Sequence, residues 1–230
     1  MLRDEYLLML AVVYSSFNKS TLNKVRTSTI EKLISDIQKD ERPAMQQILK
    51  ILPSESDKIS DLLYYLEEKG YIKGQWLPGL PGDRGIYDGF LNITAKGIDC
   101  IEDPFDTLSK EYPRIATASN VMNINANRDV NIIESAIIQK NIQKFSDTEL
   151  KELNNRLDEL KDVISDASSK ETLEEIRGDL ESNEKINAAQ KLSKFQNFVA
   201  KMRDAGTLIQ VTLLTYKIIS LIFHLPNIGL

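Results

Sequence analysis

Residues 206–225 read GTLIQVTLLTYKIISLIFHL and form the most sustained apolar run of the chain. A run of about 20 residues is the length that a helix needs to cross a bilayer. Gln210, Lys217 and His224 recur in it at intervals of seven, so a helix would place all three on one narrow stripe. The other sides of that helix are apolar and require a cover other than water.

The sequence leaves two covers open for this segment. Lipid is one, with the polar stripe lining a wet path or facing a partner helix. Protein is the other, and the segment is then the central helix of a bundle. The residues expected to contact membrane or a partner helix are Leu208, Ile209, Leu213, Lys217, Ile218, Leu221, Ile222 and Phe223.

Charge is distributed unevenly just upstream of the apolar segment. Residues 146–181 hold 12 acidic and 5 basic residues, whereas residues 182–204 carry a net charge of +3. A basic segment beside an apolar helix suits an anionic membrane surface. It also suits docking onto the acidic helices that precede it, which is the simpler interpretation.

Residues 146–230 are expected to form a C-terminal helical hairpin or bundle. Ser146 and Glu149 have the spacing of a capping box at a helix start, and Ser168 is expected to begin the next helix in the same way. The apolar pattern then continues without a proline, which predicts one long helix or two helices joined near Gly206. Leucines three and four residues apart predict a short coiled-coil seam for oligomerisation, made by Leu150, Leu153, Leu157 and Leu160.

Two irregular segments precede the helical part. Residues 106–119 lack any period and are interpreted as a linker. Residues 120–143 alternate in the manner of strands and contain six asparagines, which suggests amide ladders or tight turns. A hairpin lying on the preceding domain and strand pairing between subunits both remain open, and the marginal stability of a lone hairpin favours pairing. The candidate oligomerisation residues in this segment are Ile124, Val130 and Ile132.

The N-terminal part of the chain predicts helices separated by turn signals. Residues 2–17 carry apolar side chains three and four apart, and a second helix follows a polar loop. Pro43 fits the first turn of a third helix. Ser54 and Asp57 have the spacing of a capping box for a fourth helix, which Gly70 ends.

The phrase LLYYLEEKGYIKG, followed by GFLNITAKGIDCIE, resembles the winged-helix family. The resemblance implies a winged-helix domain over residues 1–105, with a helix packed under a two-stranded wing. Charge disfavours duplex binding by this domain, because it holds 13 basic and 16 acidic residues and DNA affinity depends on neutralising phosphates. The side chains that could contact nucleic acid are Lys58, Lys73 and Arg84. Contacts with protein are the expected alternative.

Patterns for catalysis and metal binding are missing from the sequence. His224 is the single histidine and lies in the apolar segment, and Cys100 is the single cysteine and falls on a short core-like helix. Triad catalysis and Cys/His metal sites therefore lack partners. A lone cysteine excludes an intrachain disulfide and suits a reducing compartment. The sequence predicts no enzyme activity, no cofactor and no metal.

The composition of the 230-residue chain is that of a folded protein, with 42% hydrophobic and 27% charged residues. Its net charge of −5 argues against indiscriminate nucleic-acid binding. The expected fold class is α+β, mostly α: an N-terminal winged helix, a short β-hairpin or strand segment, and the C-terminal helical hairpin or bundle.

A second resemblance concerns the whole order of segments. A winged helix, the Asn-rich stretch NINANRDVNII, acidic helices and an apolar last helix resemble small bacterial proteins associated with phage defence. This resemblance implies an antiviral effector whose last helix acts on membranes when exposed. We therefore expect a non-enzymatic, self-assembling homo-oligomer in the cytoplasm, lying on or inserting into the inner membrane, with lipid or protein as partner. The alternative is a DNA-binding winged-helix transcription regulator with a C-terminal oligomerisation domain.

Overall fold

The computed structural model describes residues 2–20, 24–41, 43–76, 89–112, 144–202 and 204–225. The chain is mostly helical with a small three-stranded antiparallel sheet, as the expected fold class requires. Contacts divide it into two units. The N-terminal unit comprises Leu2–Glu102 and Gln196–Leu213, and the helical unit comprises Asp103–Phe195 and Leu214–Asn227. The Asn-rich segment predicted at 120–143 lies outside the described residues.

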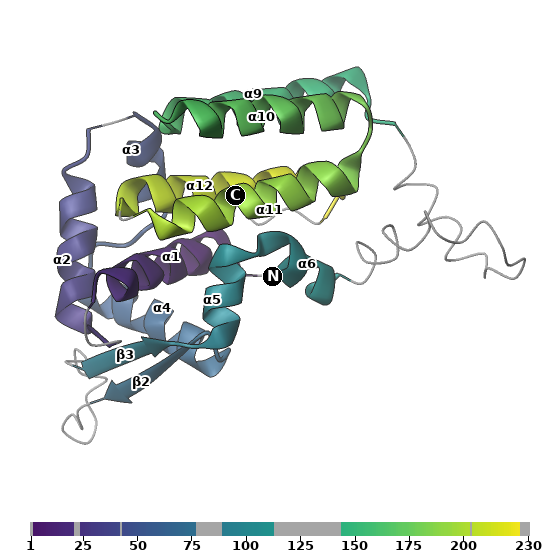
Figure 1. Cartoon of the computed structure of the whole chain (residues 1–230). Coiled ribbons are helices and arrows are strands. Elements are labelled where there is room, and N and C mark those ends of the chain that lie inside the picture. The colour runs from purple at the N-terminus through teal and green to yellow at the C-terminus, as the bar shows by residue number, and fades with distance from the viewer. Residues whose placement is uncertain are drawn as a thin grey trace, which may run out of the picture. The chain divides into compact units, whose positions relative to one another are not determined.

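The N-terminal unit is built around its first helix. Its elements are α1 (Asp4–Lys19), β1 (Val25–Arg26), α2 (Thr27–Gln38), α3 (Pro43–Leu49), α4 (Ser56–Glu68), β2 (Ile72–Trp76), β3 (Gly89–Ile93) and α5 (Ala95–Glu102). Residues 7–14 of α1 are each at most 2% exposed, because α2, α4 and α5 pack against this helix (Figure 1). The sequence predicted an amphipathic helix here, whereas the observed helix is buried on every side.

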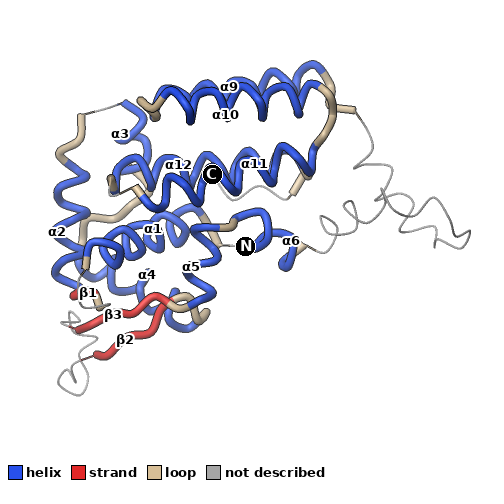
Figure 2. Tube along the Cα trace, in the orientation of Figure 1, coloured by secondary structure: helices blue, strands red, loops and turns tan. Residues whose placement is uncertain are grey.

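The sheet of the N-terminal unit has the strand order β1-β3-β2, and both pairs are antiparallel (Figure 2). Ile72 pairs with Ile93 at one end of the β2–β3 ladder, and Val25 of β1 pairs with Leu91. The two strands expected after α4 are therefore present. Strand β1 falls within the polar loop predicted after the first helix, and its two residues are too few to show a period.

The ends of α4 differ in how well the sequence predicted them. The start signal at Ser54 and Asp57 was wrong, because the helix begins at Ser56 and its N-cap residue, Glu55, makes no capping bond with its side chain. The end at Gly70 is confirmed. This glycine has a φ of 76°, a left-handed conformation that costs glycine least, and the next N–H donates back to the carbonyl of Leu66 at 2.9 Å.

The helical unit contains α6 (Pro104–Glu111), α9 (Asp147–Val163) and α10 (Ala167–Glu181) with parts of two further helices. These are α11 (Lys185–Lys201) and α12 (Ala205–Ile222), so the end of the chain forms two helices rather than one. Helix α6 occupies residues that the sequence assigned to a linker. Asp103 caps it by accepting from the N–H of Asp106, and Pro104 begins it, which are ordinary start signals in a segment too short to show a period.

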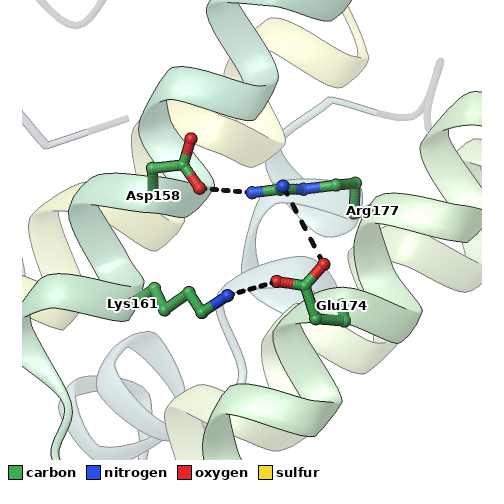
Figure 3. A network of polar contacts seen from close by, with 4 residues as sticks. All are labelled: Asp158, Lys161, Glu174 and Arg177. Carbon is green, nitrogen blue, oxygen red and sulfur yellow. Dashed lines mark hydrogen bonds and ion pairs between the residues drawn. The ribbon is translucent and has the colours of Figure 1, made fainter.

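Helices α9 and α10 form a hairpin in the helical unit (Figure 1). The predicted capping box at the start of α9 is confirmed, since Ser146 and Glu149 bond reciprocally. The predicted start of α10 at Ser168 was wrong, because Asp166 caps this helix by accepting from the N–H of Ser169 at 2.8 Å. A network of ion pairs between partly exposed side chains joins the two helices (Figure 3).

Candidate functional site

Helix α12 is the described helix that is long and apolar enough to cross a membrane, and 78% of its 18 residues are buried inside the protein. Of the residues predicted to contact membrane or a partner helix, Lys217 and Leu221 are half-buried. The other six are buried: Leu208, Ile209, Leu213, Ile218, Ile222 and Phe223. The cover of this helix in the folded chain is therefore protein. Its first half belongs to the N-terminal unit and its second half to the helical unit.

Polar contacts hold the first half of α12 in the N-terminal unit. Asp204 caps the helix, accepting from the N–H of Gly206 at 3.1 Å and from the hydroxyl of Thr207 at 2.6 Å. Gln196 Nε2 on α11 donates to Thr212 Oγ1 at 2.7 Å, and this bond is buried. The amide of Gln210 lies 3.5 Å from the sulfur of Met45 on α3. These contacts fix the rotation of α12 about its axis.

The end of α11 is anchored to α1 and α5 by side-chain hydrogen bonds. Asn18 Nδ2 donates to the carbonyl of Ala200 at 3.2 Å, and Asn197 Nδ2 donates to Glu102 Oε2 at 3.3 Å. The hydroxyl of Tyr14 donates to the other carboxylate oxygen of Glu102. Burial, followed by the hydrogen bond to Glu102, raises the pKa of Tyr14 well above its ordinary value. Glu102 therefore joins three helices through one carboxylate.

The second half of α12 presents one open stripe in the helical unit. Leu214, Lys217 and Leu221 are half-buried at helical spacing, while the residues between them are mostly buried. Of the three polar residues that the sequence placed on one stripe, Gln210, Lys217 and His224, only Lys217 belongs to this half-buried stripe. A lysine in the middle of an apolar helix is thus accommodated by partial exposure of its side chain.

The end of α12 contacts α6 and α9 in the helical unit. The rings of Phe223 and Phe105 lie 6.0 Å apart between centroids. His224 has a φ of 49° and follows the helix, while the next N–H, of Leu225, donates to the carbonyl of Ser220 at 2.9 Å. Pro226 was expected to end this helix, but the left-handed residue ends it earlier.

An ionisable cluster surrounds the start of α9. His224 Nδ1 lies 3.5 Å from Glu149 Oε1. Hydrogen bonds from the backbone and hydroxyl of Ser146 lower the pKa of Glu149, with smaller contributions from His224 and Lys185. Burial lowers the pKa of Lys185, whose ammonium lies 4.3 Å from the ring centroid of Phe145. The hydroxyl of Ser146 donates to the second carboxylate oxygen of Glu149 at 2.7 Å, so this carboxylate links the start of α9 to the residues that follow α12.

Several buried polar atoms along α11 and α12 have no hydrogen-bond partner within the described structure. They are Gln196 Oε1, Thr215 Oγ1 and Ser220 Oγ. Each such atom costs about 1–3 kcal/mol of stability, because it loses water without gaining a protein partner. The core around α12 is therefore less favourable than a wholly apolar core of the same shape.

The candidate oligomerisation residues fall into two groups. Leu153, Leu157 and Leu160 of α9 are each at most 1% exposed within a single chain, and Leu150 is half-buried. The predicted coiled-coil seam is thus occupied inside the helical unit. Ile124, Val130 and Ile132 lie outside the described residues, so their role in assembly stays a prediction.

The candidate nucleic-acid contacts do not form a basic surface in the described part of the chain. Lys58 on α4 is exposed and pairs with Glu55 at 3.2 Å. Lys73 is exposed on β2, and Arg84 lies outside the described residues. A surface groove of about 470 Å³ lies beside the start of α4, lined by carboxylates and lysines together with apolar side chains. Its mixed charge does not favour a phosphate backbone.

The sequence predicted Cys100 to be a core residue and gave no catalytic or metal-binding pattern. Cys100 is buried at 2% exposure, in agreement with the core position expected for it. No group of three or more His, Cys, Asp or Glu side chains in the described segments could hold a metal ion.

Sequence reasoning missed the polar side chains that anchor α11 and α12: Asn18, Glu102, Gln196 and Asn197. Gln196 carries a weak signal, because a glutamine beside Phe195 on the apolar side of α11 interrupts an otherwise hydrophobic stripe. The other three carry none, since single polar residues near helix ends are ordinary surface residues.

Comparison of the chain with protein-family models, with curated proteins and with solved structures found no match.

Proposed function

We propose that this chain is a non-enzymatic, self-assembling protein whose last helix, α12, is sheltered in the folded state and associates with or disrupts a membrane after release. The observation that carries the proposal is that α12 has the length and apolar content of a membrane span while 78% of it is buried in the protein. A defence effector of a bacterial cytoplasm that acts at the inner membrane fits this behaviour.

The contacts around α12 support a releasable helix. Its first half and the end of α11 are held partly by polar bonds, among them Gln196 to Thr212 and Asn197 to Glu102. Three buried polar atoms, Gln196 Oε1, Thr215 Oγ1 and Ser220 Oγ, have no hydrogen-bond partner among the residues that the structure describes, which lowers the free energy needed to undock the helix. The core helix of a soluble scaffold is buried in the same way. The experiment must therefore distinguish a releasable, membrane-active helix from a fixed core helix.

The release of α12 can be tested with the purified full-length chain. The variant Asn18→Ala/Asn197→Ala removes two anchors of α11 and should favour undocking of the helix that follows it. We expect this variant to co-sediment with vesicles in a form resistant to alkaline carbonate and to release an enclosed dye. The wild-type chain should do so less.

A second pair of variants tests whether α12 itself enters the membrane. Leu214→Asp/Leu221→Asp changes half-buried positions, so the fold should persist, but each charge opposes insertion by about 3 kcal/mol. Combined with Asn18→Ala/Asn197→Ala, the anchor variant, these two substitutions should abolish dye leakage. The control Asn187→Asp/Gln190→Asp adds the same charge at exposed positions of α11 and should leave the leakage unchanged. If the anchor variant leaves vesicles sealed and stays in the supernatant, α12 is only the core of a soluble scaffold.

The N-terminal unit is proposed to be a winged helix that contacts protein. The support is its element order, with α4 leading into β2 and β3, and the strand order β1-β3-β2. The same topology supports a second candidate, a DNA-binding regulator. Absence of binding to labelled duplex at about 50 mM salt would remove that candidate, because phosphate contacts are strongest at low salt.

A further inference from the structure

Phe198 is the one large hydrophobic side chain that the described structure leaves exposed, at 49%. It lies on the solvent-exposed side of α11, and the next residue, Val199, is fully buried. Exposed single apolar residues are common on proteins. What distinguishes this one is the charge around it.

Lysines flank Phe198 on the same side of α11. Lys194 lies four residues before it and Lys201 three residues after it, so the three side chains share one helix face. Both lysines are exposed, and neither forms an ion pair within the described part of the chain. Lys191, in contrast, pairs with Asp179 at 2.9 Å and with Glu175 at 3.4 Å. We call Lys194, Phe198 and Lys201 the 194–201 face.

Two carboxylates lie close to this face, one by sequence and one through a hydrogen bond to α11, and both accept hydrogen bonds from other groups. The carboxylate of Asp204 caps α12, and that of Glu102 accepts from Tyr14 and Asn197. The bond from Asn18 to the carbonyl of Ala200 also brings the end of α1 to the end of α11, and exposed Lys19 follows Asn18. The donors to the two carboxylates are neutral, so both carboxylates keep their negative charge, but within the described segments neither forms an ion pair with Lys194 or Lys201. Both lysines stay exposed, on a chain whose net charge is −5.

We propose that the 194–201 face docks the folded chain on an anionic lipid surface, with the lysines at the headgroup phosphates and the ring of Phe198 in the interfacial layer. This inference rests on the proposed function and names its membrane-contacting surface. Lysines near an anionic bilayer each strengthen binding about fivefold. An aromatic ring flanked by cations is the composition that interfacial helices use, and an acidic protein surface would not need the exposed ring.

The test measures binding of the full-length chain to vesicles of phosphatidylcholine alone and of equimolar phosphatidylcholine and phosphatidylglycerol. The wild-type chain should bind the anionic vesicles and be released at about 1 M salt. Lys194→Glu/Lys201→Glu should weaken binding at least 25-fold, from about fivefold per lysine, and Phe198→Ser about tenfold. The matched control Lys32→Glu/Lys151→Glu makes the same charge change at exposed positions of α2 and α9 and should retain most of the binding.

Three outcomes would overturn the inference: equal loss in the control, full binding by Phe198→Ser, or equal binding to both vesicle types. A change in the mass of the chain without vesicles, seen only in the face variants, would instead assign the face to contact with a second copy. Failure of the proposed function gives a different result from failure of this inference.

Salt-reversible binding through this face without carbonate-resistant insertion of α12 would uphold the inference and reject the release of the helix.

Discussion

Tyr14 and Glu102 show how single side chains set the stability of the N-terminal unit. The tyrosine hydroxyl is buried and donates to a carboxylate that also receives Asn197 from α11. Removing the hydroxyl leaves one carboxylate oxygen without its donor in a partly buried position. Bonds to charged groups contribute more than bonds between neutral groups, so the loss should be measurable.

The variant Tyr14→Phe should lower the free energy of unfolding by about 2 kcal/mol near neutral pH. Because folding raises the pKa of Tyr14, the folded chain keeps this proton at pH values where the unfolded chain, with an ordinary pKa of 10.0, releases it. The stabilisation is therefore complete below pH 10 and is lost as the pH rises above it. Denaturant titrations should show the difference between wild type and variant shrinking by up to about 1.4 kcal/mol per pH unit there. Parallel curves above pH 10 would contradict this account.

The buried bond between Gln196 and Thr212 predicts a strongly non-additive pair of substitutions. Gln196→Met leaves the threonine hydroxyl without its donor, and Thr212→Val leaves the amide without its acceptor, so each should cost about 1–3 kcal/mol. The double variant removes both polar groups and should be nearly as stable as wild type. A double-mutant cycle in urea measures this coupling. Additive losses would show that the bond is not formed in solution.

At the scale of residues, the sequence predicted one helical stripe for Gln210, Lys217 and His224, but α12 ends at Ile222 and His224 follows it in a left-handed conformation. The sequence could not predict that Gln210 would be buried against Met45 while His224 is exposed. That difference arises from contacts with residues far away in the chain, which no local spacing records.

At the scale of elements, α9 begins directly after its predicted cap Ser146, just as α3 begins at the predicted Pro43. Ser146→Ala removes one half of the capping box of α9 and should lower the free energy of unfolding by about 1 kcal/mol. Thr148→Ala, at an exposed position in the same turn, is the control and should change stability by less than about 0.5 kcal/mol. Thermal unfolding followed by circular dichroism compares the two. Equal effects would mean that the cap is not the source of the loss.

The ion pairs between α9 and α10 in Figure 3 are expected to contribute little. Lys161 pairs with Glu174 at 2.6 Å, and Arg177 bonds to Asp158, but all four side chains are partly exposed. Water and salt screen such pairs, so Glu174→Gln should reduce stability slightly at low salt and not at about 1 M salt. Denaturation at the two salt concentrations tests this, and a loss that persists at high salt would indicate a packing role instead.

Elements with a strong period were predicted, and short ones were not. The helices with apolar stripes, α2, α4, α9 and α10, were expected within a few residues of their observed bounds. Strand β1 and helix α6 were missed, because two residues or two turns give too little pattern. Helix α10 begins at Ala167 and is capped by Asp166 rather than by Ser168, since two capping signals stand close together and the aspartate forms the bond.

At the scale of the whole molecule, α11 and α12 each supply residues to both units: residues 185–195 and 214–222 belong to the helical unit, and residues 196–201 and 205–213 to the N-terminal unit. The sequence indicated a boundary near residue 105 and could not show that residues 196–213 complete the N-terminal unit. The reason is that a helical stripe predicts burial without identifying the partner. We expect residue pairs such as Asn18 and Ala200, which are 182 positions apart, to make folding depend on the end of the chain.

Unfolding should accordingly be a single transition rather than two. Both units would lose core residues such as Leu208 and Ile218 when α12 leaves, so neither keeps its full stability alone. Near-ultraviolet circular dichroism, reporting on aromatic packing, and far-ultraviolet circular dichroism, reporting on helices, should give coincident curves in urea. Two separated midpoints would show that the units unfold independently.

The sharing of α11 and α12 also has a practical consequence for protein production. A gene fragment that encodes only the first 102 residues would yield a polypeptide that lacks residues 196–213 of its own core, so its apolar interior would be exposed and inclusion bodies are the expected product. Supplying residues 183–225 as a separately expressed peptide should restore solubility, in the manner of a split reporter.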